Sequence, residues 1–139
     1  MISYNSENAF QLENESKIST WLEGVILNEN YNLGEINYIF CNDDYLHKLN
    51  VEFLQHDTLT DIISFDYTIG KIIQGDIYIS TERVSDNAKD FNVSNTDELH
   101  RVMVHGVLHY CGYKDKTAEE VKLMREKENH YLKELANIQ

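Results

Sequence analysis

The chain has 139 residues, of which 42% are hydrophobic, and its formal net charge at pH 7 is −12. This length favours one domain, spanning residues 1–139, that buries enough surface to fold without help from a metal. The sequence holds no apolar run near the ~18 residues of a membrane span, and it does not begin with the basic and apolar regions of a secretion signal, so we expect a cytoplasmic protein. Its two cysteines, Cys41 and Cys111, exclude a disulfide framework.

The acidic charge is concentrated in the first 100 residues. Residues 1–100 carry 5 basic and 18 acidic side chains, a balance of −13, whereas residues 101–139 carry 7 basic and 6 acidic side chains, a balance of +1. Neutralisation of phosphates by Lys and Arg drives non-specific binding to nucleic acid, so this composition excludes a protein that coats DNA or RNA. We expect any RNA contact to be local to the last third of the chain, and we expect no DNA or membrane partner.

Hydrophobic periodicity predicts helices and strands that alternate irregularly along the chain. Residues 1–13 are expected to hold one or two short strands. Further strands are predicted at 35–41, 61–67 and 72–80. Helices are predicted at 15–28, at 43–54, at 81–91, after residues 92–96, and from the capping box Thr117-x-x-Glu120 onward. This order is typical of an α+β domain in which a mixed sheet of about four strands packs with helices.

The apolar positions also predict which side of each helix faces the core. On the helix at 15–28 the inward residues are Ile18, Trp21, Leu22, Val25 and Ile26. On the next two helices they are Leu46, Leu49 and Phe53, then Val84, Ala88 and Phe91. On the last helix they are Val121, Met124, Tyr131, Leu132 and Leu135, with a charged outer face in solvent. Gly75 predicts either a strand bulge or the close approach of another backbone, and residues 55–60 are predicted to form a polar connection.

Two histidines on one predicted helix form the motif with the clearest chemistry. His105 and His109 stand at i and i+4, so their side chains share one helix face with about 5–6 Å between Cβ atoms. Gly112 falls where helices commonly end in a left-handed residue, and a turn there can bring Asp115 back to the same point. The pattern His-x3-His-x2-Gly-x2-Asp therefore predicts a metal site, and we expect the helix that carries it to lie in the core next to a cleft.

Three protein ligands leave a fourth position open, which is the pattern of catalytic zinc, because structural zinc usually has four. In the zinc-protease motif His-Glu-x-x-His the general base directly follows the first ligand, but here Gly106 occupies that place. Glycine within a helix costs about 1 kcal/mol relative to alanine, so Gly106 is expected to serve close packing or to leave room above the metal. The simpler alternative is a packed helix with two histidines and a capping glycine.

Three segments together resemble one protein family. The segment from His105 to Tyr113 reads His-Gly-Val-Leu-His-Tyr-Cys-Gly-Tyr. It is similar to the signature His-Gly-x-Leu-His-x-x-Gly-Tyr of the YbeY family of bacterial rRNA maturation factors. The family's Thr-Asp-Val-Leu-Ser-Phe strand appears as residues 60–65, and its Gly-Asp-Ile strand as residues 75–77. In order and spacing the resemblance covers roughly residues 45–116.

The resemblance implies a metal-dependent, single-strand-specific endoribonuclease that acts in rRNA maturation, at the 3′ end of 16S rRNA, and in ribosome quality control. The implied cofactor is one Zn²⁺ per chain, held by His105, His109 and Asp115. The implied partners are rRNA and small-subunit ribosomal proteins or assembly intermediates. A zinc ion with these ligands can polarise a phosphodiester and lower the pKa of its bound water; whether that water or an RNA 2′-hydroxyl attacks stays open.

Two positions depart from the family pattern. Most members place a third histidine where this chain has Asp115, and a carboxylate oxygen is also a zinc ligand. The family also commonly carries a catalytic arginine where this chain has Leu54. The cations that could contact phosphate instead are Arg83, Arg101 and Lys48. The candidates for orienting a ligand or transferring a proton are Asp61, Asp76 and His100, of which His100 is expected to point away from the ligand face.

Two other functions remain open from the sequence. A zinc peptidase has a similar helix, turn and third ligand, but Gly106 in place of the general base disfavours it. A ribosome-associated binding module would use the metal only for structure; Leu54 favours this interpretation, and the open fourth position disfavours it.

Overall fold

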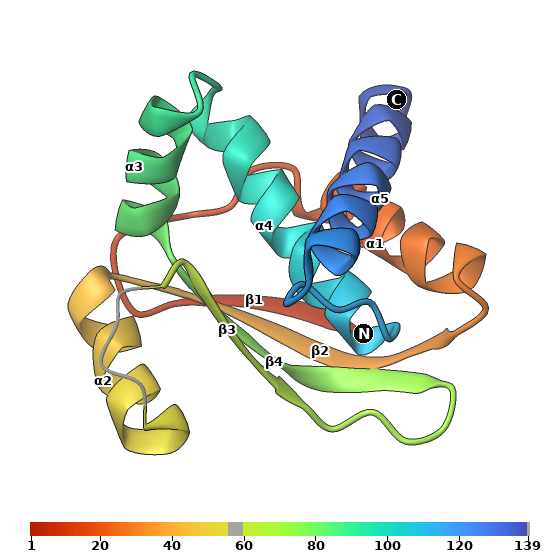
Figure 1. Cartoon of the computed structure of the whole chain (residues 1–139), viewed down its shortest axis with the longest axis horizontal. Coiled ribbons are helices and arrows are strands. Elements are labelled where there is room, and N and C mark those ends of the chain that lie inside the picture. The colour runs from red at the N-terminus through yellow and green to blue at the C-terminus, as the bar shows by residue number, and fades with distance from the viewer. Residues whose placement is uncertain (56–59, 139) are drawn as a thin grey trace.

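Four strands form one mixed β-sheet in the computed structural model, which describes residues 1–55 and 60–138. The strands are β1 (Ile2–Ser6), β2 (Asn32–Cys41), β3 (Ile62–Asp66) and β4 (Ile72–Ser80). They lie in the order β1-β2-β4-β3. β2 pairs in parallel with both β1 and β4, and β3 runs antiparallel to β4 at one edge (Figure 1). The predicted mixed sheet is therefore confirmed.

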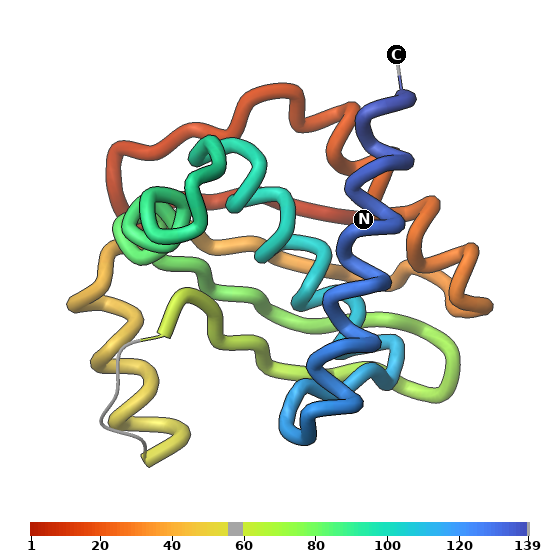
Figure 2. The backbone as a smooth tube through the Cα atoms, turned by 45° about the horizontal axis from the view of Figure 1, so that its top comes forward, coloured from red at the N-terminus to blue at the C-terminus, as the bar shows by residue number. Residues whose placement is uncertain are grey.

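Five helices pack on the sheet within these described residues. They are α1 (Glu15–Asn28), α2 (Asp43–Leu54), α3 (Thr81–Asp90), α4 (Asn95–Tyr110) and α5 (Ala118–Ala136). Figure 1 shows α1, α3, α4 and α5 on one side of the sheet and α2 on the other. Figure 2 shows α5 crossing over the C-terminal part of α4. The α+β class and the place of α4 in the core agree with the prediction, and none of the described helices is long and apolar enough to cross a membrane.

The alternation of buried residues along β4 explains why the sheet has two different faces. Ile73, Ile77 and Ile79 are fully buried and belong to the main core with α1, α4 and α5. The intervening residues point to the other face, where α2 covers the sheet only in part. There Leu46 packs with a smaller cluster that includes Ile63. The main core therefore lies between the sheet and α4, which is the helix that carries the two histidines.

Most predicted inward residues are buried, including all five on α1, but Leu49 and Leu132 are half-buried and three others are exposed. Phe53, Phe91 and Val121 are 59%, 58% and 48% exposed. Phe53 lies at the end of α2, where its ring meets that of Phe65 edge-on at 6.0 Å between centroids. Phe91 and Val121 line a cavity instead of the core. Periodicity marks apolar positions correctly but does not show what covers them. Of the polar connection predicted at 55–60, residues 56–59 lie outside the described part of the chain.

Two glycines let α4 approach the sheet. A Cβ atom on Gly106 would lie 3.0 Å from Cδ1 of Ile77 and 3.1 Å from Cδ1 of Ile62, so this glycine serves close packing and faces the sheet, not the space above the histidines. A Cβ atom on Gly75 would overlap the hydroxyl of Tyr110, which donates to the carbonyl oxygen of Phe65 at 2.9 Å. Gly75 thus marks a close approach, and the strand irregularity lies instead in β2.

Replacement of Gly75 by alanine is expected to lower the free energy of unfolding by about 3 kcal/mol, because the added methyl group overpacks the site and displaces the Tyr110 hydroxyl. Denaturant unfolding measures this change. Gly24→Ala is the matched control, because a Cβ atom there has no neighbour within 4 Å; within a helix it should stabilise the protein by about 0.5–1 kcal/mol. Equal stability of Gly75→Ala and the unmodified protein would contradict this account.

Candidate metal centre

The end of α4 brings the three predicted ligands together. His105 and His109 lie one turn apart, with 4.5 Å between their ring centroids. The helix ends at Gly112, whose φ of +99° is in the left-handed region that glycine tolerates. The backbone N–H of Tyr113 then donates to the carbonyl oxygen of Leu108 at 3.1 Å, which closes the helix end. This reversal returns the chain toward the histidines and places Asp115 beside them.

Three ligand atoms form a small triangle at this point. Nε2 of His105 lies 3.0 Å from Nε2 of His109, and Oδ2 of Asp115 lies 3.2 Å and 3.1 Å from these two nitrogens. Ligand atoms bound tetrahedrally at about 2.0–2.1 Å from zinc are about 3.3 Å apart, so the triangle has the right size. Among the residues that the structure describes, this is the one group of three such side chains that could hold a metal ion.

The outer nitrogen of each imidazole has its own partner. Nδ1 of His109 lies 2.9 Å from the backbone carbonyl oxygen of Tyr113, and Nδ1 of His105 lies 2.7 Å from Oε2 of Glu128. Carbonyl and ionised carboxylate oxygens only accept, so the neutral rings carry their proton on Nδ1 and a lone pair on Nε2. Three acceptor atoms therefore converge. A cation between them relieves their repulsion, and a partner on the far nitrogen is typical of metal-binding histidines.

Glu128 on α5 is a buried carboxylate, 4% exposed. Its second oxygen accepts a hydrogen bond from Nη1 of Arg101 at 2.8 Å, and Nη1 of Arg125 lies 3.4 Å from the same atom. Burial acts to raise the pKa of Glu128, but the hydrogen bonds from His105 and Arg101 outweigh it and hold that pKa below its usual value. Burial acts to lower the pKa of His105, and Glu128 reverses this, so the pKa of His105 is raised. Glu128 thus fixes the orientation of His105.

A cavity of about 310 Å³ opens beside His105 and Asp115. Its wall comes from β3 with the residue before it, α3, α4 and α5, and it includes Asp61, Asn87, Phe91, Glu98, Arg101, Val121, Arg125 and Glu128. Asp61 accepts a hydrogen bond from Nδ2 of Asn87 at 3.3 Å, and burial raises the pKa of its carboxyl group. Burial, followed by the charge of Asp61, also raises the pKa of Glu98. The cavity therefore borders two of the three side chains of the ligand triangle, His105 and Asp115.

The predicted phosphate contacts are not all near this cavity. Arg101 lines it, but its guanidinium already contacts Glu128 and donates to Oδ1 of Asn129 at 2.7 Å. Arg83 forms an ion pair with Asp43 at 2.9 Å, and Lys48 is exposed on α2. Neither is among the residues that line the cavity. Of the three candidate cations, the structure therefore brings Arg101 to the site.

Of the three candidates for ligand orientation or proton transfer, the structure places only Asp61 at the cavity. Asp61 reaches the cavity, as described above. Asp76 lies on β4, where its Oδ1 accepts a hydrogen bond from Nδ2 of Asn37 at 3.0 Å. His100 packs edge-on against Trp21, with 6.1 Å between ring centroids, and so points away from the ligands as expected. Leu54, in place of the family arginine, is 42% exposed at the end of α2.

Sequence reasoning missed Glu128, because the charged residues of α5 were assigned to its solvent face. A signal was nevertheless present. Met124, Glu128, Tyr131 and Leu135 follow one another at spacings of four, three and four, and all four are buried. A carboxylate on the apolar stripe of a helix needs a buried partner, and the predicted metal site is the place to look for it.

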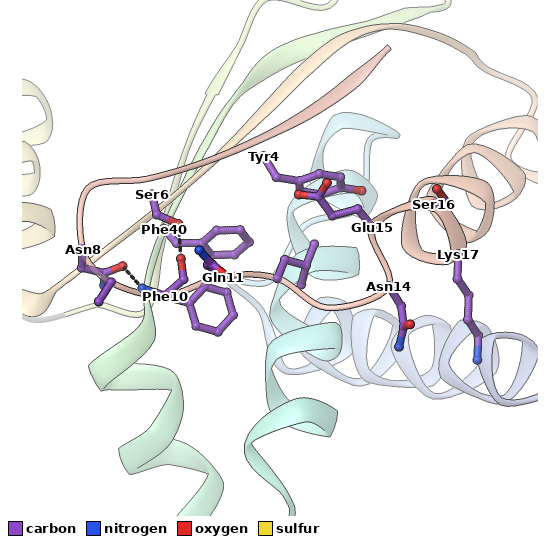
Figure 3. A pocket seen from close by; sticks show the side chains of 12 residues that line it. Tyr4, Ser6, Asn8, Phe10, Gln11, Asn14, Glu15, Ser16, Lys17 and Phe40 are labelled. Carbon is purple, nitrogen blue, oxygen red and sulfur yellow. Dashed lines mark hydrogen bonds between the residues drawn. The ribbon is translucent and has the colours of Figure 1, made fainter.

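A second cavity, of about 910 Å³, lies away from the ligand triangle, between β1, α1 and the segment that joins them. In Figure 3 the ring of Phe10 lies near that of Phe40, and Asn8 and Ser6 hold the segment in place. The hydroxyl of Ser6 donates to the carbonyl oxygen of Phe10 at 2.6 Å, and the backbone N–H of Phe10 donates to Oδ1 of Asn8 at 3.1 Å. These contacts hold the segment that joins β1 to α1 in place.

Comparisons with known proteins show to which family the chain belongs. The family model of Endoribonuclease YbeY matches residues 2–136. The chain is 64% identical to Endoribonuclease YbeY of Flavobacterium johnsoniae over 129 residues, 93% of each chain. It is 58% identical to that of Flavobacterium psychrophilum over 133 residues, 96% of this chain and 95% of the other. The solution structure of TM1509 from Thermotoga maritima matches with a TM-score of 0.69 at 28% identity, covering 97% and 89% of the two chains. The chain therefore belongs to the Endoribonuclease YbeY family.

Proposed function

We propose that the protein is a zinc-dependent, single-strand-specific endoribonuclease that matures the 3′ end of 16S rRNA and takes part in ribosome quality control. Family membership makes it an endoribonuclease, and hence a nuclease and a hydrolase. The observation that supports the metal is the convergence of three acceptor atoms from His105, His109 and Asp115. We propose these three side chains as the metal ligands, one ion per chain, in a single domain that spans residues 1–139 and works in the cytoplasm.

The residues around the ligands have separate tasks in this proposal. A zinc ion here supplies a Lewis acid for a phosphate oxygen and for water. Glu128 holds His105 in place, and the Tyr113 carbonyl does the same for His109. Asp61, on the cavity wall, has a raised pKa that suits it to hold or move a proton at a substrate oxygen. Apolar Phe91 and Val121 give the same wall surfaces against which bases can pack.

Positive charge for the substrate comes from α4 and α5 in this proposal. Arg101 and Arg125 both line the cavity and both lie beside Glu128. The side chain of Arg125 is 52% exposed and lies 3.4 Å from Glu128, so it can turn toward a phosphate while Arg101 keeps its 2.8 Å hydrogen bond to Glu128. We propose that these two arginines take over the role of the family arginine that Leu54 replaces.

Cleavage of RNA with and without metal tests the proposal. Protein loaded with Zn²⁺ is expected to cut single-stranded RNA faster than a duplex of the same sequence, and removal of the metal with a chelator is expected to abolish cutting, with recovery on adding Zn²⁺. RNA cutting at the same rate after complete metal removal would contradict the metal role. Casein is the control substrate for the peptidase alternative. That alternative is disfavoured because Gly106, which packs against Ile77 and Ile62, occupies the position where zinc proteases carry the general base.

The uneven charge of the chain bears on which partners it binds. We propose that ribosomal small-subunit proteins or assembly intermediates supply the affinity that the acidic residues 1–100 deny to free RNA. The isolated protein is therefore expected to bind free RNA weakly, with a slope of log K against log salt shallower than about −4, since few phosphates are neutralised. Binding titrations from low to physiological salt measure the slope. A steeper slope would mean that an extended basic surface contacts RNA.

A further inference from the structure

We infer that Glu29 is a positioning residue for the metal centre, because it fixes Tyr113 and, through the Tyr113 backbone, the imidazole of His109. This inference rests on the metal centre proposed above. It concerns a residue that lies at the far end of α1, 80 positions before His109 in the chain.

Tyr113 is held at both ends. Its backbone carbonyl oxygen accepts the hydrogen bond from Nδ1 of His109 at 2.9 Å, which leaves Nε2 of that ring free for a metal. Its side-chain hydroxyl donates to Oε1 of Glu29 at 2.6 Å. Both bonds belong to one residue, so the place of the carbonyl depends on where the ring is anchored. Glu29 therefore acts on His109 through one intermediate residue.

Glu29 is itself fixed and ionised. The hydroxyl of Tyr131 donates to its Oε2, and Nζ of Lys127 lies 3.4 Å from the same oxygen. The Glu29 side chain is 11% exposed. Burial acts to raise the pKa of Glu29, but the hydrogen bonds from Tyr113 and Tyr131 outweigh it, so the pKa lies below its usual value. An ionised carboxylate with three donors around it is a rigid anchor.

The position of Glu29 in α1 supports this role. Glu29 is the C-cap residue of α1, and its carboxylate therefore stands at the negative end of the helix dipole. A negative charge there destabilises the helix, and the last turn of α1 has no basic residue to balance it. Helix stability does not explain a glutamate at this place. Its contacts with Tyr113, Lys127 and Tyr131 do.

α5 supports both histidines through neighbouring residues. Glu128 contacts His105 directly. Lys127 and Tyr131 hold Glu29, which holds Tyr113, which holds His109. The two imidazoles are thus oriented by separate paths, and a change in one path leaves the other intact. This separation makes the inference testable.

The test compares Tyr113→Phe, Glu29→Ala and the double variant with the unmodified protein. The dissociation constant for Zn²⁺ is measured by competition with a chelator. Each single variant is expected to bind Zn²⁺ about tenfold more weakly, because loss of the partner that orients a metal-binding histidine lowers metal affinity by about this factor. The double variant should be no weaker than the weaker single variant, because both changes break one path. Tyr4→Phe is the matched control: it removes a tyrosine hydroxyl whose partner is Oγ of Ser19 at 2.9 Å, outside the path from Glu29 to His109, and it should bind Zn²⁺ as the unmodified protein does.

A second measurement needs neither metal nor RNA. The ring ¹⁵N chemical shifts of His109 in metal-free protein report which nitrogen carries the proton. The Nδ1-protonated form is expected in the unmodified protein, and a mixture of both forms in Tyr113→Phe and Glu29→Ala. Unchanged tautomers with unchanged Zn²⁺ affinity would overturn the inference, as would an equal loss of affinity in Tyr4→Phe. Mixed tautomers in a protein that cuts no RNA would support the inference and count against the proposed function alone.

Discussion

The double variant His105→Ala, His109→Ala is expected to bind no zinc and to cut RNA at least about 10³-fold more slowly, since the loss of a Lewis acid at the reacting phosphate is worth several kcal/mol. Its fold should remain, because both imidazoles are partly exposed and the core residues of α4 are untouched. Elemental analysis gives the metal content, and circular dichroism gives the helix content of the same samples.

His130→Ala is the matched control for this experiment. His130 lies on α5 with a side chain that is 54% exposed, and it belongs to no ligand group in the described structure. Asp115→His is a second comparison, since it exchanges one zinc ligand for another and should keep the metal. Stoichiometric zinc in the double histidine variant would refute the assignment of the ligands.

Glu128→Ala is expected to weaken zinc binding by about 10- to 100-fold, because His105 loses the acceptor that orients its ring. The same change should lower the free energy of unfolding by about 2 kcal/mol, because Arg101 loses a buried ionic hydrogen bond. Chelator competition and denaturant unfolding measure these two effects on one preparation.

Glu126→Ala separates the role of Glu128 from the general charge of α5. Glu126 is exposed two residues earlier on the same helix, and its loss removes the same charge without touching His105. It should leave both zinc affinity and stability unchanged. If Glu126→Ala weakened zinc binding as much as Glu128→Ala, the effect would come from net charge and not from the contact with His105.

The sequence predicted correctly those features that depend only on residues close together in the chain. The helix at 15–28 and the strand at 72–80 have the predicted bounds, because the apolar period of each is regular and its ends are marked by polar residues or turns. The capping box at Thr117 is present with both of its hydrogen bonds. The convergence of His105, His109 and Asp115 was also predicted, since it depends on one helix turn and one glycine.

Contacts between distant elements were beyond the same reasoning. The roles of Glu128 and Glu29 arise because α5 crosses α4 and α1, and no local period encodes where two helices cross. Gly75 shows where prediction from local sequence ends. Its place in a strand predicted a bulge or a close approach, and only the position of Tyr110, on a different element, decides between the two.

The ribosome synthesises α5 last, although residues of α5 orient the proposed ligands on α4. The three proposed ligands are complete once residue 115 has been added, but Glu128, Lys127 and Tyr131 come later. A chain that stops before α5 therefore has the ligands without the carboxylate that orients His105 and without two of the groups that hold Glu29. Nuclease activity should accordingly begin only after α5 has been synthesised and has packed, so that unfinished chains leave RNA intact.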